Sequence, residues 1–325
     1  MPVASGKKVS VIIPVFNTGE LAIKLILKII KSDYKNLEFI LIDDGSTDDS
    51  LSLLKEFKRQ YDLTAKKIKA APKLIILHQD NAGASAARNA GLAKASGDYV
   101  CFIDSDDSVE KNYIRSLVEK LEQYDSYNST ELRIALATSA VRYQRKKSVR
   151  ELYIKEPEPA NPDEDFTEYI LRLLASDGRL HAVNTKIFRR NIIEHFSIQF
   201  DEKINFAEDL KFVLEYLKAA HRVQYSRLAF VTEPLYIYNY GTDTSVVSLS
   251  SLSWGNWQKS FDHLCKWAGK KPSKKSNKLI HKIRFHWKIS HAFAVARSNQ
   301  SLGHKFQHAS PLLVLPSLII VKFRK

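Results

Sequence analysis

The sequence predicts an α/β fold in which a mostly parallel sheet is flanked by helices and followed by a basic helical C-terminal extension. The first hundred residues alternate short, β-branched apolar runs with segments whose apolar residues recur at helical spacing. Strands that alternate with helices form parallel sheets covered on both faces. Ligands bind such sheets beyond the carboxyl ends of the strands, and a polar cluster follows each predicted strand here.

Four buried strands are predicted in this part of the chain because each apolar run is short and lacks the helical period. Helices are expected between them at 20–31 and 51–61, and within the Ala-rich segment 81–95. The acidic and hydroxyl side chains of 43–50 offer N-caps to the second helix. The predicted strands cover residues 9–16, 37–42, 73–77 and 98–103.

The middle of the chain is less regular. Residues 132–145 are predicted to form a strand, and 227–240 are predicted to form two short strands. A helix is expected over 166–175, after a Pro-rich acidic loop, and another over 206–220.

Composition and cysteine usage indicate where the protein works. The two cysteines, Cys101 and Cys265, form no CxxC pair, which favours a reduced, cytoplasmic chain. The first ten residues lack the pattern of a signal peptide, and no apolar run approaches the ~20 residues of a membrane-spanning helix. We therefore expect a cytoplasmic protein that is peripheral on the cytoplasmic face of the cell membrane.

The net charge of +14 resides in the C-terminal part of the chain. Residues 251–325 carry 15 lysines and arginines against one acid, so the first 250 residues are balanced. This part suits a helix on an anionic membrane surface. A helix packed on the catalytic body with a solvated basic rim is the alternative. Nucleic acid is an unlikely partner because no recognised nucleic-acid motif accompanies the charge. One apolar helical face is predicted to contain Leu279, Ile280, Ile283 and Trp287.

Three carboxylates, those of Asp104, Asp106 and Asp107, follow the fourth predicted strand within four positions. Like charges this close repel one another. Mg²⁺ and Mn²⁺ prefer oxygen ligands and are often held by one or two carboxylates together with substrate phosphates. A divalent cation is one interpretation of the cluster, and a solvated turn that caps a helix is the other.

Four motifs in order resemble those of family 2 glycosyltransferases with the GT-A fold, of the inverting type that builds bacterial cell-surface glycans. They are "VSVIIPVFN", "ILIDDGSTDDS", "NAGASAARNAGLAKASGDYVCFIDSDD" and, later, "AEDLKF". The resemblance is dense over 9–107, thinner over 186–240, and fades beyond. It implies a catalytic domain over 1–248, with a nucleotide-sugar half of about 1–107 and an acceptor half of about 108–248. The basic helical region would then cover 249–325.

The resemblance also implies roles for single residues. Asp44 would contact the base of the nucleotide-sugar, Arg88 would lie near the base or diphosphate, and Asp106 near the ribose. Asp107, with Asp106 beside it, would bind Mn²⁺ or Mg²⁺. The implied nucleotide-sugar contacts are Pro14, Val15, Asn17, Asp44, Asn81, Arg88, Asp104, Ser105 and Asp106.

The catalytic base would be Asp209, with Glu208 beside it. On charge alone, acids at these positions are typical of a helix start. Asn184 and Thr185 stand where the family often has a tryptophan, in a segment that would face the acceptor, which weakens inference about that acceptor.

The predicted reaction is metal-dependent, inverting transfer of a sugar from a nucleotide-sugar, with a UDP-sugar expected, to a hydroxyl of a glycan or glycolipid acceptor. This would serve cell-surface polysaccharide or lipooligosaccharide synthesis. The alternative is a catalytically silent protein of similar fold, held on a membrane or nucleic acid by its basic tail.

Overall fold

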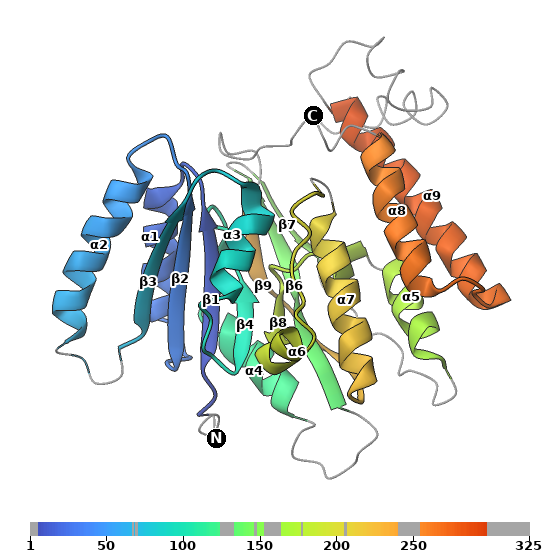
Figure 1. Cartoon of the computed structure of the whole chain (residues 1–325), viewed down its shortest axis with the longest axis horizontal. Coiled ribbons are helices and arrows are strands. Elements are labelled where there is room, and N and C mark those ends of the chain that lie inside the picture. Colours follow the sequence, from blue (N-terminus) through green and yellow to red (C-terminus); the bar gives the residue numbers. More distant parts are fainter. Residues whose placement is uncertain are drawn as a thin grey trace. The chain divides into compact units, whose positions relative to one another are not determined.

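A computed structural model describes residues 6–66, 68, 71–123, 133–145, 148–152, 164–176, 178–204, 207–239 and 254–297. The chain divides into two compact units (Figure 1). The first comprises 1–156, 182–202 and 215–245, and the second 157–181, 203–214 and 246–325. The predicted boundary at 248 would assign 157–181 to the catalytic domain, and that division stays a prediction.

The first unit is built on one nine-stranded sheet with the order β3-β2-β1-β4-β8-β6-β9-β5, in which β7 pairs with β6. The strands are β1 (Val9–Val15), β2 (Leu37–Asp44), β3 (Lys73–Gln79), β4 (Tyr99–Phe102), β5 (Ser108–Val109), β6 (Arg133–Arg145), β7 (Ser148–Leu152), β8 (Lys186–Arg189) and β9 (Tyr225–Asn239).

The four predicted strands of the first hundred residues form the parallel half of this sheet. Strand β1 pairs in parallel with both β2 and β4, and β2 pairs in parallel with β3. Every residue of β2 is buried, as expected for a strand covered on both faces. The α/β fold class is therefore confirmed in the part of the chain where the periodicity is clearest.

The other half makes the sheet mixed. Strand β8 is antiparallel to β4 and β6, while β9 is parallel to β6 and antiparallel to β5. The prediction of two short strands over 227–240 was wrong, because β9 is one strand. Its register against β6 slips between Val231 and Tyr236, so the bulge contains Pro234, which cannot donate to a ladder.

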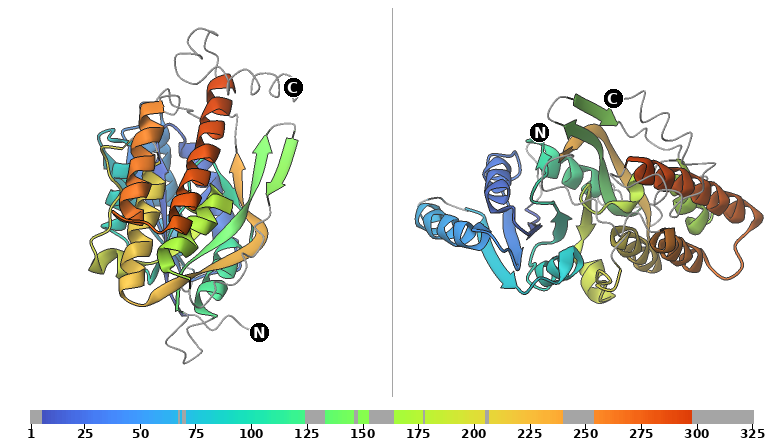
Figure 2. Two further views of the ribbon diagram at one scale, coloured as in Figure 1. Left: turned by 90° about the vertical axis from the view of Figure 1, so that its right-hand side faces the viewer. Right: turned by 90° about the horizontal axis from the view of Figure 1, so that it is seen from above.

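Helices cover both faces of this sheet. Figure 2 shows α1 on one face and α3 on the other. One large cluster joins β1, β2 and β4 to α1, α2 and α4, with Ile26, Leu54 and Leu117 fully buried. The helices are α1 (Gly19–Ile30), α2 (Ser50–Ala65), α3 (Gly83–Leu92), α4 (Tyr113–Glu122), α6 (Arg190–His195) and the later part of α7 (Glu208–Arg222).

Helix α3 lies unusually close to the sheet because of Gly91. A Cβ atom at this position would come within 2.4 Å of Ile12 and 3.0 Å of Ile42. Real Cβ contacts are longer, so only glycine allows this packing. The close approach sets where Arg88, in the second turn of α3, lies relative to the strands.

The second unit contains α5 (Phe166–Ser176), a 3-10 turn (Gly178–His181), the start of α7, α8 (Trp254–Ala268) and α9 (Lys274–Arg297). Helix α9 packs against α5 and α8. Ile280 and Ile283 are buried, and the ring of Trp287 lies edge-on to those of Trp257 and Phe261.

The predicted basic helix is therefore present, and its apolar face is covered within its own unit. Trp287 itself is half-buried. Residues 298–325, the last part of the predicted basic helical region, lie outside the described residues. Across the helices that the structure describes, none has the length and apolarity needed to cross a membrane.

A buried carboxylate ties the amino ends of β1 and β2 to the turn before β4. Glu38 accepts hydrogen bonds from Ser10 (2.6 Å) and from the backbone N–H of Ser96 (2.7 Å), and it pairs with Lys8 (2.6 Å). Burial alone would raise the pKa of Glu38, but these donors outweigh it and lower the pKa to about 2. The charged form is therefore stabilised in the folded state.

We predict that Glu38 makes folding sensitive to acid. Because its pKa is lower in the folded than in the unfolded chain, its stabilisation is present above pH ~4.5 and is lost as the pH falls toward 2. The pKa shift corresponds to about 3 kcal/mol. Urea unfolding at pH 7 should show Glu38→Gln to be less stable by roughly that amount, with the difference from wild type shrinking below pH 4.5.

The matched control is Glu20→Gln, because Glu20 is an exposed partner of Lys24 on α1. It should unfold like the wild type across the same pH range. Equal pH dependence in Glu38→Gln and wild type would contradict the assignment.

Candidate functional site

Most of the predicted site residues lie at one edge of the sheet in the first unit. Strand β8 is antiparallel to both β4 and β6, so β6 runs in the same direction as β4. Strand β9 is parallel to β6. The carboxyl ends of β1, β2, β3, β4, β6 and β9 therefore meet at the same edge. This is the edge at which open α/β sheets bind ligands.

The loop after β1 is held against the loop after β2. Pro14 and Val15 end β1, and Asn17 follows with a left-handed backbone (φ 55°), which asparagine tolerates better than most residues. The backbone N–H of Asn17 donates to the hydroxyl of Ser46 (3.0 Å). The side-chain Oδ1 of Asn17 accepts the backbone N–H of Thr47 (2.8 Å). Asn17 is thereby fixed in place at the edge.

Asp44, at the end of β2, caps α3. Its Oδ1 accepts the N–H of Ala82 (2.9 Å) and the amide of Gln79 (2.8 Å), and its Oδ2 accepts the N–H of Gly83 (2.8 Å). The carboxylate thus satisfies N–H groups at the start of α3. The sequence suggested α2 as the helix that this residue caps, and that alternative was wrong.

Two neighbours of Asp44 complete this part of the edge. The side chain of Asn81 donates to the carbonyl of Asp44 (3.0 Å), and Asn81 itself is exposed. Asp43 is fully buried and lies 2.8 Å from Nδ1 of His78. Its Oδ1 has no hydrogen-bond partner among the residues that the structure describes.

Arg88 of α3 reaches the acidic loop 104–107. It is 6% exposed, it pairs with Oδ1 of Asp104 (2.9 Å), and its guanidinium lies over the ring of Phe200. The other carboxylate oxygen of Asp104 accepts the side-chain amide of Asn184 (3.1 Å). Asp104 is therefore held from two sides, and Arg88 is not a surface residue.

Asn184 and Thr185, in the segment expected to face the acceptor, are both buried, and the hydroxyl of Thr185 bonds to that of Thr138 (3.1 Å). That this segment faces the acceptor stays a prediction. The segment before β8 contributes to the site by holding Asp104.

The rest of the acidic loop is fixed by the end of β9. Asp107 is 5% exposed, and its Oδ2 accepts the hydroxyl of Tyr236 (2.5 Å) while its Oδ1 accepts the N–H of Asn239 (2.9 Å). The hydroxyl of Ser105, which is also buried, bonds to that of Thr18 (2.7 Å). Asp106 is the more exposed of the two predicted metal ligands.

Burial, and after it the neighbouring carboxylates, make Asp107 difficult to ionise. Burial raises its pKa, and the nearby charges of Asp104 and Asp106 raise it further. The hydrogen bonds from Tyr236 and Asn239 act in the opposite direction but do not cancel the effect. A cation bound beside the loop would favour the ionised form of Asp107.

The protein alone does not build a complete metal cage in the described part of the chain, where no three His, Cys, Asp or Glu side chains converge in a suitable way. One or two carboxylates plus substrate phosphates are nevertheless sufficient for Mg²⁺. The oxygen donors of Asp106 and Asp107 and the crowding of charge around them fit such a cation.

Glu208 and Asp209 open α7 and belong to the second unit. Both are half-buried. Ala207, immediately before them, has a left-handed backbone (φ 57°), which is uncommon for alanine and costs of the order of 1 kcal/mol. Their part in the site stays a prediction.

Sequence reasoning missed several residues at this edge. Tyr236 and Asn239 contact the acidic loop from more than a hundred residues away, and no local pattern marks them.

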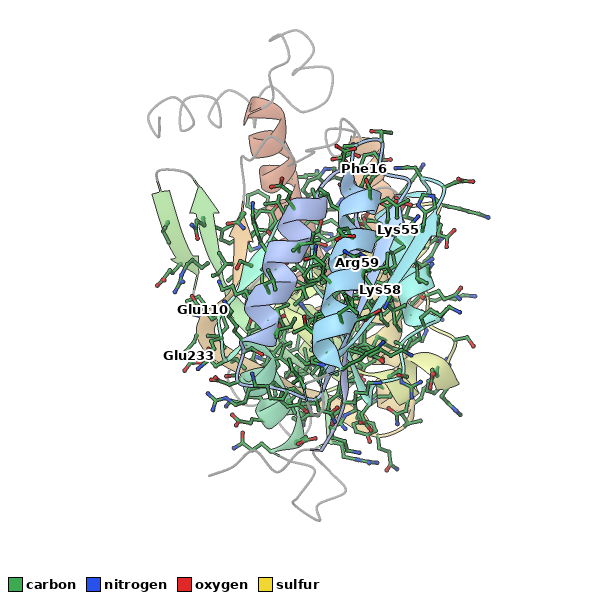
Figure 3. The ribbon with its side chains drawn as sticks, turned by 90° about the vertical axis from the view of Figure 1, so that its left-hand side faces the viewer. Phe16, Lys55, Lys58, Arg59, Glu110 and Glu233 are labelled. Carbon is green, nitrogen blue, oxygen red and sulfur yellow. The ribbon has the colours of Figure 1, made fainter. Side chains whose placement is uncertain are left out.

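Phe16 is 44% exposed directly beside Asn17, and Figure 3 shows it at the edge where α1 and α2 begin. Tyr238 is 37% exposed near the loop, and its pKa is raised to about 12, chiefly by burial and then by the charge of Asp107. No sequence signal marked Phe16, because the apolar run 9–16 places it inside the first predicted strand.

Comparison with solved structures supports the fold. The chain resembles residues 1–349 of TarS from S. aureus in complex with UDP, with a TM-score of 0.62, 17% identity, and coverage of 92% of this chain and 77% of that chain. It also resembles the mannosyltransferase PcManGT from Pyrobaculum calidifontis in complex with GDP-Man and Mn²⁺, with a TM-score of 0.57, 16% identity, and coverage of 98% and 82%.

Comparison with curated sequences identifies the family. The chain is 30% identical over 253 residues to the cholesterol galactosyltransferase of Borreliella burgdorferi, covering 76% of this chain and 65% of that protein. It spans between 16% and 65% of the length of the curated relatives that it matches first. The model of glycosyl transferase family 2 matches residues 10–193, which is more than half of the chain. With this match and the GT-A architecture of its structural neighbours, the chain belongs to glycosyl transferase family 2.

Proposed function

We propose that the protein is a divalent-metal-dependent, inverting glycosyltransferase that moves a sugar from a nucleotide-sugar to a hydroxyl of a glycan or glycolipid. The observation that carries this proposal is the acidic loop, Asp104 to Asp107, at the carboxyl edge beside Asn17, Asp44 and Arg88. Family membership supports transfer of a sugar, and the geometry of this edge supports a nucleotide diphosphate as its carrier.

The donor would lie along the carboxyl ends of β1 to β4. Asp44 and Asn81 would face the base, with the backbone of Pro14, Val15 and Asn17 beside it. Phe16, exposed at this edge, offers a ring on which a base could stack, an interaction worth about 1–3 kcal/mol. Arg88 would add positive charge near the diphosphate, while Asp104, Ser105 and Asp106 would line the ribose side.

UDP is the proposed nucleotide because a structural neighbour, TarS, is described in complex with UDP. GDP is the alternative, since PcManGT is described with GDP-Man and Mn²⁺.

Asp106 and Asp107 would hold Mn²⁺ or Mg²⁺. When bound, such an ion neutralises charge that develops on the departing diphosphate. On the protein side, Tyr236 and Asn239 hold the carboxylate of Asp107, and Arg88 with Asn184 holds that of Asp104. These contacts fix the acidic side chains before substrate arrives, so little reorganisation is needed during the reaction.

Asp209 would accept the proton of the acceptor hydroxyl as that oxygen attacks the anomeric carbon. A single in-line displacement with one base inverts the configuration at that carbon. Glu208, its neighbour, is the second candidate for the base. General-base catalysis of this kind contributes ~10²–10⁴-fold to the rate.

The acceptor is proposed to be a glycan or glycolipid at the cytoplasmic face of the cell membrane, in the synthesis of a cell-surface polysaccharide or lipooligosaccharide. A relative that is 30% identical is named a cholesterol galactosyltransferase, which supports a lipid-linked acceptor. The basic helical region 249–325 would bring the enzyme to the anionic membrane.

The rival is a silent binding protein of the same fold. Hydrolysis of a panel of nucleotide-sugars by the purified protein, with and without Mn²⁺, separates the two. Metal-stimulated release of nucleotide from one donor supports the enzyme. Binding of nucleotide without any turnover, with acceptor mixtures present, would favour the silent protein.

We predict that Asp107→Asn loses metal-dependent donor binding because the substitution removes a charge that the cation needs. Calorimetric titration of UDP with and without Mn²⁺ measures this, and circular dichroism checks that the fold survives. Asp98→Asn is the control, since Asp98 pairs with Lys7 at the opposite edge. Normal metal-dependent UDP affinity in Asp107→Asn would remove Asp107 from the metal site.

A second prediction separates binding from chemistry. Asp209→Asn should keep the UDP affinity of the wild type while single-turnover transfer falls by ~10²–10⁴-fold. Glu208→Gln, tested in parallel, should be affected less. If Asp209→Asn transfers at a near-normal rate and Glu208→Gln does not, the base is Glu208.

A third prediction concerns the membrane. The outward side of α9 carries the exposed Lys278, Lys282 and Lys288 together with Phe285, which is 57% exposed. Each lysine near an anionic surface is worth ~1 kcal/mol, and the attraction is screened by salt. Replacing these three lysines with glutamine should therefore weaken co-sedimentation with anionic vesicles strongly at low salt, and donor hydrolysis should persist.

The charge-matched control replaces three bases of α2 in the first unit with glutamine. Figure 3 labels them on that helix: Lys55, Lys58 and Arg59. This variant should sediment like the wild type. Equal losses in the two variants would mean that net charge, and not α9, determines binding.

A further inference from the structure

The end of β9 contacts the acidic loop at more points than the side chain of Asp107 alone. The hydroxyl of Tyr236 donates to Oδ2 of Asp107 (2.5 Å) and accepts the backbone N–H of Asp104 (3.4 Å). The backbone N–H of Asn239 donates to Oδ1 of Asp107 (2.9 Å), and its side-chain amide donates to the carbonyl of Asp106 (2.8 Å). One strand end therefore contacts all three acidic residues of the loop.

The register of β9 fixes these contacts. The loop joins β4 to the short strand β5, and β5 pairs with β9 so that Ser108 faces Ile237 and Val109 faces Tyr236. The N–H of Glu110 continues the pairing by donating to the carbonyl of Leu235 (2.8 Å). The loop is thus tied to β9 immediately after its last acid as well as through its side chains.

Tyr236 is held rigidly enough to fix another side chain. It is fully buried, and its ring lies edge-on to that of Tyr113 with 5.9 Å between centroids. A buried hydroxyl needs a partner, and a backbone carbonyl is sufficient, as Tyr216 shows by donating to the carbonyl of Ala135 (2.7 Å). Tyr236 donates instead to a side-chain oxygen of the acidic loop, Oδ2 of Asp107.

We propose that Tyr236 and Asn239 are positioning residues that orient Asp107 and Asp106 toward the metal–diphosphate. The proposal rests on the function proposed above. The hydroxyl of Tyr236 occupies one lone pair of Asp107 Oδ2, and the Asn239 N–H occupies one of Oδ1. Each oxygen keeps a second lone pair in a fixed direction, which is what a metal ligand requires.

The first test is Tyr236→Phe, which removes only the hydroxyl. Loss of an outer-shell partner of a metal ligand lowers metal affinity 10–100-fold. Calorimetric titration of UDP should therefore show Mn²⁺-dependent affinity reduced 10–100-fold, with metal-free UDP affinity unchanged. In turnover assays, the Mn²⁺ concentration for half-maximal activity should rise by a similar factor, while kcat at saturating Mn²⁺ stays within a few-fold of wild type.

The matched control is Tyr216→Phe, which removes an equally buried tyrosine hydroxyl of the same unit away from the acidic loop. It should lower thermal stability without shifting the Mn²⁺ dependence. If Tyr236→Phe behaves like Tyr216→Phe, Tyr236 only packs in the core and the proposal is overturned.

If Tyr236→Phe fails to fold, Asn239→Ala provides a second test of the proposal. Asn239 is only partly buried, and the substitution removes its bond to the Asp106 carbonyl alone. It should raise the required Mn²⁺ concentration by a smaller factor, and an unchanged Mn²⁺ dependence would overturn the proposal. Absence of any Mn²⁺-dependent UDP binding in the wild type would instead overturn the proposed function, and this inference with it.

Discussion

The repulsion among three carboxylates at the end of a buried strand is the constraint on which the site depends. A loop with Asp104, Asp106 and Asp107 so close would not keep one conformation unaided. Separate elements hold it: Arg88 from α3 and the segment before β8 hold Asp104, while the end of β9 holds Asp107. The first unit thus holds the side chains of Asp104 and Asp107 in place before a cation binds.

This need accounts for the change of direction in the sheet. Strands β1 to β4 pair in parallel with one another. The residues that hold the acidic loop, however, come from later in the chain. Because β8 is antiparallel to β4 and β6, the strands β6 and β9 run the same way as β4. Asn239 therefore reaches the carboxyl edge, where the acids are, and Asn184 reaches it from the start of β8. The mixed half of the sheet is the part that holds the loop.

The sequence could predict what depends on neighbouring residues. Strands β1 to β4 and the acidic cluster follow from local periodicity and from residues that adjoin one another. Tyr236 could not be predicted, because it meets Asp107 across 129 positions of the chain. It also lies in a strand that, from the sequence alone, would end at Pro234. The capping of α3 by Asp44 was missed for a related reason: the nearest helix start in sequence, α2, is not the one that Asp44 meets in space.

The second unit shows how composition can predict a helix without showing which of its faces is buried. Residues 274–297 are helical and basic, as the sequence predicts, but Ile280, Ile283 and Trp287 pack within the unit. An apolar face cannot be buried against α5 and α8 and also enter a bilayer. On the described outward side, the groups left to attract this helix to a membrane are chiefly the lysine charges, with Phe285 beside them. Electrostatic attraction weakens as salt increases, whereas insertion of apolar groups does not. Salt dependence thus distinguishes a basic surface from an inserted helix.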